Sequence, residues 1–191
     1  MSRVILTFLT YGSLAIAQPA RDDWKAKRFV TGELTRSLAD APLTARERAQ
    51  IYRVVDNATN QYSLPDPRKD KQREVVMSSP VGSIELALNG SKQVLVRGPD
   101  SFCGTTGNCP IWIFIRQGGQ LRLALQSGTN GLIVRKTSSR GFHDLAAGWH
   151  WGAFDEQFRV YRWDGARYRQ VDCYEANYPQ SDRNPIITAC P

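Results

Sequence analysis

The sequence predicts an α+β protein in which N-terminal helices precede a predominantly antiparallel β domain, a sandwich or a partial propeller or barrel, stapled by disulfides. Three observations lead to this fold class. An amphipathic helical pattern lies before residue 62. Short β-branched and aromatic runs alternate with Gly, Asn and Ser clusters from residue 75 onward. The 191 residues include an even number of cysteines, four, and a chain of this length can bury one good core.

Residues 1–17 have the pattern of a secretory signal peptide. Arg3 gives a positive start, an uncharged apolar stretch follows, and residues 15–17 form a small-residue cleavage site. No apolar run approaches the roughly 18 residues that a membrane helix requires. We therefore expect a secreted or periplasmic protein without a transmembrane segment after cleavage; a retained N-terminal anchor is the alternative. Loss of Arg3 would lower the formal net charge from +7 to +6.

Residues 18–62 are predicted to be a helical segment. Apolar residues recur near helical spacing between residues 22 and 40. A second helix is expected over residues 45–57, because Thr44 and Glu47 have the spacing of a capping box. Its apolar side is expected to pack on the sheet.

Residues 63–74 combine two prolines with many charged side chains, which predicts a linker or a solvated loop. The antiparallel β domain is predicted over residues 75–191. Its expected strands cover residues 82–88, 93–96, 111–116, 121–126, 132–136, 143–149, 158–163 and 168–171.

The first of two clear hairpins turns at Gly118-Gly119, a two-residue turn signal. Alternation along its strands places apolar residues on both faces, so the hairpin is expected to be buried on both sides. One face is predicted to carry Trp112, Phe114, Leu121, Leu123 and Leu125, and the other Ile113, Ile115 and Ala124.

The second hairpin is predicted to turn at Asp164-Gly165, also as a two-residue turn. This register places Arg162 opposite Arg167 and, with Arg169, makes a basic stripe. An anion bound there would relieve the repulsion between like charges. A solvated edge, where salt screens the repulsion, is the alternative.

The cysteines are expected to form structural disulfides, since oxidising compartments let disulfides persist. Closeness in sequence favours Cys103–Cys109 and Cys173–Cys190 among the three possible pairings. Neither spacing fits the usual C-x2-4-C of zinc sites, and no C-x-x-C redox motif is present. We therefore expect no metal and no cofactor.

A resemblance to uncharacterised exported proteins of soil bacteria, of the acidobacterial type in particular, rests on the runs VGSIELALNGSKQVLVRGP, FCGTTGNCPIWIFIR, NGLIVRKTSSRGFHDLAAGWH and YRWDGARYRQVDCY. It covers about residues 43–178, and CGxxGNCxxWIF is its most specific motif. It implies the exported compartment and the fold class, and brings no activity, substrate or site residues. The blocks are also loosely similar to integrin-type FG-GAP blades, although LNGSK lacks the aspartates of their calcium-binding loop.

Aromatic residues are the first candidates for a binding surface. Trp149 and Trp151 have strand spacing and are flanked by glycines, and Tyr161 and Trp163 could extend them. Such a surface stacks on sugar rings or inserts into a partner's pocket. Burial of these aromatics in the core is the alternative.

The two histidines are the candidates for catalysis. His143 and His150 are seven residues apart on one strand, so they should point to opposite faces and not share a metal. Ser138, Ser139, His143 and Asp144 include the residue types of a hydrolytic triad, but no G-x-S-x-G motif surrounds them. A solvated loop is the alternative.

These features together favour binding over catalysis. We expect an envelope or extracellular module whose partner is an anionic glycan or an exported protein, because a positive exported surface attracts acidic partners. No nucleic-acid partner is expected. A secreted hydrolase with a histidine-centred site and an inhibitor of the lysozyme-inhibitor type are the alternatives. The ligand and the oligomeric state stay open at this point.

Overall fold

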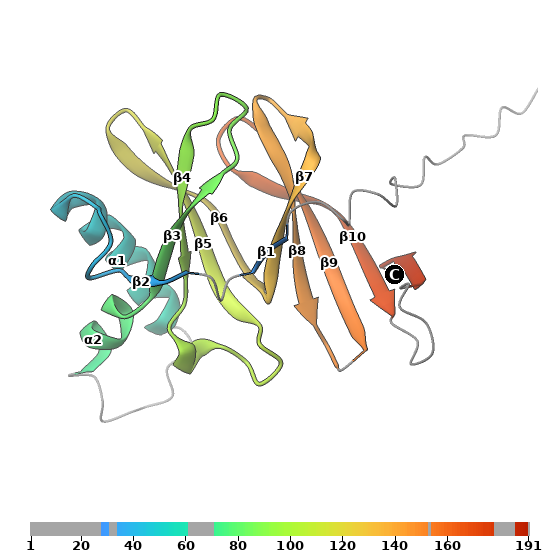
Figure 1. Ribbon diagram of the computed structural model, residues 1–191, viewed down its shortest axis with the longest axis horizontal. Helices are drawn as coiled ribbons and strands as arrows, with labels where there is room; N and C mark the ends of the chain where they lie inside the picture. Colours follow the sequence, from blue (N-terminus) through green and yellow to red (C-terminus); the bar gives the residue numbers. More distant parts are fainter. Residues whose placement is uncertain (1–27, 31–33, 61–70, 153, 178–185, 191) are drawn as a thin grey trace, which may run out of the picture.

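The computed structural model describes residues 28–30, 34–60, 71–152, 154–177 and 186–190 (Figure 1). Within them the chain forms two helices and two antiparallel sheets, which confirms the predicted fold class. The predicted signal peptide and most of the predicted linker lie outside the described residues.

Each sheet is built mainly from strands that are consecutive in the sequence. The five-stranded sheet has the order β2 (Arg36–Ser37), β3 (Pro80–Glu85), β4 (Lys92–Arg97), β5 (Cys109–Gln117), β6 (Gln120–Thr129). The six-stranded sheet has the order β1 (Arg28–Val30), β7 (Gly131–Ser139), β8 (Phe142–His150), β9 (Asp155–Trp163), β10 (Tyr168–Asn177), β11 (Ile186–Ala189). All eight predicted strands are present with shifted ends.

The molecule has three layers (Figure 1): the helices α1 (Ala45–Asn60) and α2 (Gln72–Met77), the five-stranded sheet, and the six-stranded sheet. The core between the two sheets contains Leu95, Ile113, Leu145 and Trp163. A second core lies between the helices and the five-stranded sheet. Its members include Ile51, Val55, Val76, Val96, Trp112 and Phe114. The five-stranded sheet is therefore buried on both faces, as the predicted hairpin required.

The helix α1 begins at the predicted capping box. The Thr44 backbone N–H donates to Glu47 Oε2 at 3.0 Å, and the Glu47 N–H donates to Thr44 Oγ1 at 3.2 Å. Its apolar side packs on the five-stranded sheet, as predicted. The part of the helical prediction nearer the N-terminus is wrong within the described residues: β1 and β2 pair with β7 and β3 there. Edge pairing to a sheet outweighs the weak helical periodicity of this segment.

The predicted linker also contains ordered structure, since α2 begins at Gln72. Val76 supplies the reason: it is fully buried in the helix-side core. The charged residues that precede Val76 give the segment the composition of a solvated loop, so the short helix was not predicted.

The Gly118-Gly119 turn is confirmed, with φ of 59° and 71° and Gln117 paired with Gln120. One prediction for this hairpin is wrong. The ladder shifts between Ile113 and Phe114, so that Leu125 pairs with Ile113 and joins the core between the sheets. A bulge of this kind adds one residue to one strand and reverses the faces beyond it.

The register predicted for the second hairpin is wrong as well. Trp163 pairs with Tyr168, and Arg162 lies opposite Arg169 instead of Arg167. The turn has four residues because the Asp164 carboxylate accepts the backbone N–H groups of Ala166 and Arg167, at 2.8 and 2.9 Å. An aspartate that folds back on its own backbone in this way favours a wider turn than the two-residue type.

Both predicted disulfides, Cys103–Cys109 and Cys173–Cys190, are present. The first closes a loop before β5, and the second ties β10 to the end of β11. None of the helices in the described residues has the length and apolar character needed to cross a bilayer.

Candidate ligand-binding cavity

A cavity of about 720 Å³ lies where both sheets, the end of α1 and the Cys103–Cys109 loop meet. Its size is within the range of about 300–1,000 Å³ that is typical of small-molecule sites. The loop supplies one wall, β5 and β6 a second, and Trp149 and Arg159 of the six-stranded sheet a third.

Trp149 reaches from β8 across to β6, where Gly128 makes room for the indole. A Cβ atom on Gly128 would lie 2.0 Å from Cζ3 and 2.9 Å from Cε3 of Trp149. Real Cβ atoms do not come this close to another atom, so any larger residue at position 128 must displace the indole. Trp149 itself is half-buried and lines the cavity.

Arg159 is the one charged side chain among the described residues that line the cavity. Its guanidinium carbon lies 5.7 Å from the centre of the Trp149 ring, and its Nε donates to Gln157 Oε1 at 3.3 Å. No ion pair connects Arg159 to a carboxylate in the described part of the chain. The positive charge of Arg159 thus has no ion-pair partner among the residues that the structure describes, which favours an anionic ligand in the cavity.

The other walls offer neutral hydrogen-bonding groups. Ser101, Thr106, Gln126 and Ser127 line the cavity, and Ser127 Oγ lies 3.0 Å from the Tyr161 hydroxyl. Hydroxyl and amide groups both donate and accept, as sugar hydroxyls do. The cavity can therefore match a polyhydroxylated ligand through several contacts.

Trp112 also lines the cavity, and its indole Nε1 is buried without a hydrogen-bond partner in the described part of the chain. A buried donor left unpaired costs about 1–3 kcal/mol. A ligand oxygen that reached this group would remove that cost.

The disulfide loop is fixed to the six-stranded sheet by Asn108. Its Nδ2 donates to the carbonyl of His150 at 2.7 Å, and its Oδ1 accepts the His150 N–H at 2.9 Å. A further bond from Nδ2 to Thr106 Oγ1, at 2.7 Å, holds the loop itself. These bonds set the distance between the loop wall and Trp149.

The four predicted aromatic residues do not form one surface. Trp149 lines the cavity, whereas Trp151 lies beyond the end of β8 with 64% of its surface exposed. Tyr161 and Trp163 are buried in the core between the sheets, where Trp163 packs against Phe142 and Tyr168. For Tyr161 and Trp163 the structure therefore agrees with the alternative prediction, burial in the core.

The predicted basic stripe has partners within the protein. Arg162 lies 3.8 Å from the buried carboxylate of Asp144, and Arg169 donates to Asp164 at 2.9 Å. The backbone N–H of Arg167, followed by the Arg169 side chain, holds the pKa of Asp164 well below its usual range. The stripe is thus partly neutralised, unlike Arg159.

The candidate catalytic residues are not joined as a triad. Ser139 Oγ donates to Asp144 Oδ1 at 2.8 Å, but His143 Nδ1 lies 3.0 Å from the carbonyl of Arg135. His150 Nε2 lies 2.6 Å from Asn130 Nδ2 and 3.5 Å from a Glu156 oxygen. Ser138 lies opposite His143 in the β7–β8 ladder, but no hydrogen bond between a serine hydroxyl and a histidine ring is found among the described residues.

Within the described residues, no group of three or more His, Cys, Asp or Glu side chains is placed to hold a metal ion. No protein-family model, curated protein or solved structure matches this chain. The geometry of the cavity therefore carries the functional argument.

Sequence reasoning missed Arg159 and Gly128. A signal for Arg159 exists: it alternates with Tyr161 and Trp163, so it is a charged residue on the core-facing side of a strand. Gly128 lies across the sandwich from Trp149, far from it in the sequence, and no local pattern connects the two.

Proposed function

We propose that this chain is an exported binding module that holds an acidic sugar unit of an anionic glycan in the cavity. The observation that carries the proposal is Arg159, which has no carboxylate partner among the described residues and is positioned against Trp149. The guanidinium would pair with the carboxylate of the sugar, because Arg presents paired N–H donors that match a carboxylate.

A sugar fits the remaining features of the cavity better than a simple anion does. The Trp149 ring can contact the apolar face of a pyranose, and the serine, threonine and glutamine side chains can bond to its hydroxyls. A small inorganic anion would leave most of the 720 Å³ unfilled.

Export is supported by two independent features. The first 17 residues have the pattern of a signal peptide. Both cysteine pairs are oxidised, and disulfides persist in oxidising compartments. Anionic glycans of cell envelopes are encountered in such compartments.

The proposal is tested by isothermal titration calorimetry with carboxylated oligosaccharides: oligogalacturonate, oligoalginate and peptidoglycan fragments. Methyl-esterified oligogalacturonate serves as the uncharged counterpart. We expect at least one carboxylated ligand to bind and its methyl ester to bind less tightly. Loss of one charged hydrogen bond corresponds to roughly tenfold or more in affinity, so Arg159→Met should weaken binding by about that factor.

The matched control is the double variant Arg167→Gln, Arg169→Gln, which removes two exposed arginines of the stripe. It should retain the wild-type affinity. Loss of binding in this control with retention in Arg159→Met would move the site to the second hairpin. Failure of all carboxylated glycans to bind, with capture of a protein from an envelope extract instead, would overturn the glycan proposal.

A further inference from the structure

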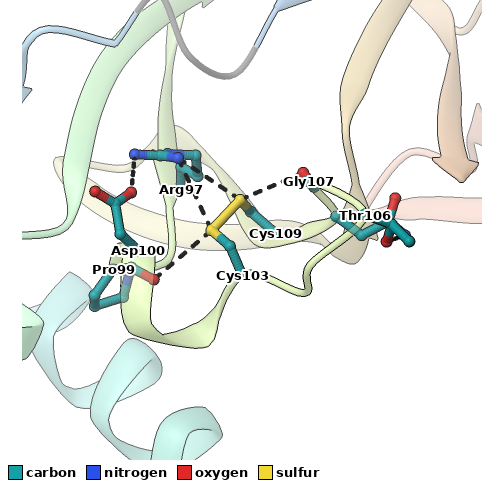
Figure 2. The surroundings of a disulfide bond; sticks show 8 residues. Arg97, Pro99, Asp100, Cys103, Thr106, Gly107 and Cys109 are labelled. Carbon is teal, nitrogen blue, oxygen red and sulfur yellow. Dashed lines mark hydrogen bonds and ion pairs between the residues drawn. A yellow bond between two sulfur atoms is a disulfide. The ribbon is translucent and has the colours of Figure 1, made fainter.

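The Cys103–Cys109 disulfide has an arginine against both of its sulfur atoms. Arg97 Nη1 lies 3.8 Å from Cys103 Sγ and 3.6 Å from Cys109 Sγ (Figure 2). The sulfurs also contact backbone carbonyls, Cys103 Sγ that of Pro99 at 3.8 Å and Cys109 Sγ that of Gly107 at 3.6 Å. Disulfide sulfur is a poor hydrogen-bond acceptor, whereas a thiolate is a strong one.

Arg97 is incompletely satisfied while the disulfide is intact. Its Nε is buried and has no hydrogen-bond partner among the described residues. Its Nη2 donates to Asp100 at 2.6 Å, but the Asp100 side chain is 87% exposed, so water screens that charge. The guanidinium charge is therefore available to a sulfur anion beside it (Figure 2).

We propose that Cys103–Cys109 is a thiol–disulfide exchange site that reacts with small thiols. Cys103 is half-buried and Cys109 is 4% exposed, so the incoming thiolate attacks Cys103 Sγ. The sulfur–sulfur bond breaks, and its electron pair leaves on Cys109 Sγ, where Arg97 stabilises the new thiolate. Stabilisation of the leaving thiolate accelerates exchange.

The full reaction consumes two small thiols. The first forms a mixed disulfide with Cys103. The second attacks the small-molecule sulfur of that mixed disulfide, which releases Cys103 and forms the oxidised small-molecule disulfide. Two protons from the small thiols pass to the cysteines, and the Pro99 and Gly107 carbonyls can accept hydrogen bonds from the resulting S–H groups.

The second disulfide provides an internal comparison. Cys173 and Cys190 are both half-buried, and the hydrogen bonds from arginine to sulfur found among the described residues all go to the first bridge. Exposure alone predicts that this bridge is the easier one to open, because neither of its cysteines is as buried as Cys109. If Arg97 stabilises the leaving thiolate, the opposite order is expected, and Cys103–Cys109 opens first.

The test uses the full chain with both bridges oxidised, treated with reduced glutathione at pH 7. Aliquots are quenched in acid, labelled with N-ethylmaleimide and analysed by peptide mass spectrometry. We expect Cys103–Cys109 to open about tenfold faster than Cys173–Cys190. Arg97→Met should slow opening of the first bridge by about tenfold, and Arg97→Lys, which keeps the charge, should slow it less.

Arg122→Met, which removes an exposed arginine of β6, is the matched control and should leave both rates unchanged. Circular dichroism checks that each variant is folded. If Arg97→Met does not fold, the order of the two bridges in the wild type and the rate in Arg97→Lys decide. Equal or reversed rates for the two wild-type bridges, or an unchanged rate in folded Arg97→Met, would overturn the proposal. This proposal does not rest on glycan binding, although the same loop forms one wall of the cavity, and glutathione alone is its probe.

Discussion

Arg159 and Trp149 owe their arrangement to a residue with no side chain. Gly128 leaves the space that the indole occupies, and the indole lies beside the guanidinium of Arg159. The shape of the cavity thus depends on one glycine that faces a tryptophan from the other sheet. A glycine at such a site marks close approach of another group rather than a turn.

Gly128→Ala tests this dependence. The new methyl group would overlap the indole, so we expect Trp149 to move and the free energy of unfolding to fall by about 1–3 kcal/mol. Urea unfolding followed by tryptophan fluorescence measures the loss.

Gly104→Ala is the matched control for that substitution. A Cβ atom on Gly104 meets no atom nearer than 3.7 Å, and the residue lies in the loop wall of the same cavity. Its stability should stay within about 0.5 kcal/mol of the wild type. Equal losses in the two variants would show that Gly128 has no special relation to Trp149.

At the scale of the elements, α1 is fixed to the sheet at its first turn as well as along its apolar side. Glu47 completes the cap with Thr44, and its other oxygen accepts the Nε of Arg116 in β5 at 2.8 Å. Gln50 accepts the N–H of Leu121 at 3.2 Å. These contacts hold the turn of the first hairpin to the first turn of α1. They thereby fix the position of the whole helix, whose last turn lines the cavity.

The contribution of this contact should depend on pH. The Thr44 N–H, followed by Arg116, lowers the pKa of Glu47 below its usual value of 4.5 against the opposing effect of burial. Because the folded-state pKa lies below the unfolded-state pKa, the stabilisation is present above about pH 4.5 and is lost as the pH falls through the folded-state pKa.

Glu47→Gln should remove this pH dependence while it keeps a capping side chain. We expect a loss of about 1 kcal/mol or less at pH 7, because the Arg116 side chain is half-exposed and water screens its ion pair with Glu47. Urea unfolding from pH 7 to pH 3 should show that the difference between wild type and variant shrinks in acid. A difference that grows in acid would contradict the assignment.

At the scale of the whole molecule, the sequence predicted what depends on local pattern. The eight strands, the cap of α1, the Gly118-Gly119 turn and both disulfides follow from periodicity, turn residues and cysteine spacing. The short strands β1 and β2 could not be predicted, because pairing with distant strands is what makes them strands.

Two register errors and the cavity likewise depend on structure that the local sequence pattern does not predict. The bulge that moves Leu125 and the carboxylate that widens the turn at Asp164 each changed a face or a partner without a clear local signal. The cavity joins side chains from α1, the disulfide loop, β5, β6, β8 and β9. Only Trp149 among the predicted binding residues lies there, since packing of the two sheets determines which aromatic residues are core and which line an opening.

The most direct test of the central claim is an NMR titration of the tryptophan indole N–H signals with the tightest-binding carboxylated oligosaccharide. The chain has five tryptophans, and Trp149→Phe assigns the signal of interest. The account predicts that the Trp149 signal shifts on titration, that the buried Trp163 signal stays in place, and that Arg159→Met needs roughly tenfold more ligand to reach the same Trp149 shift. A shift confined to the exposed Trp151, unaffected by Arg159→Met, would place binding elsewhere and contradict the claim.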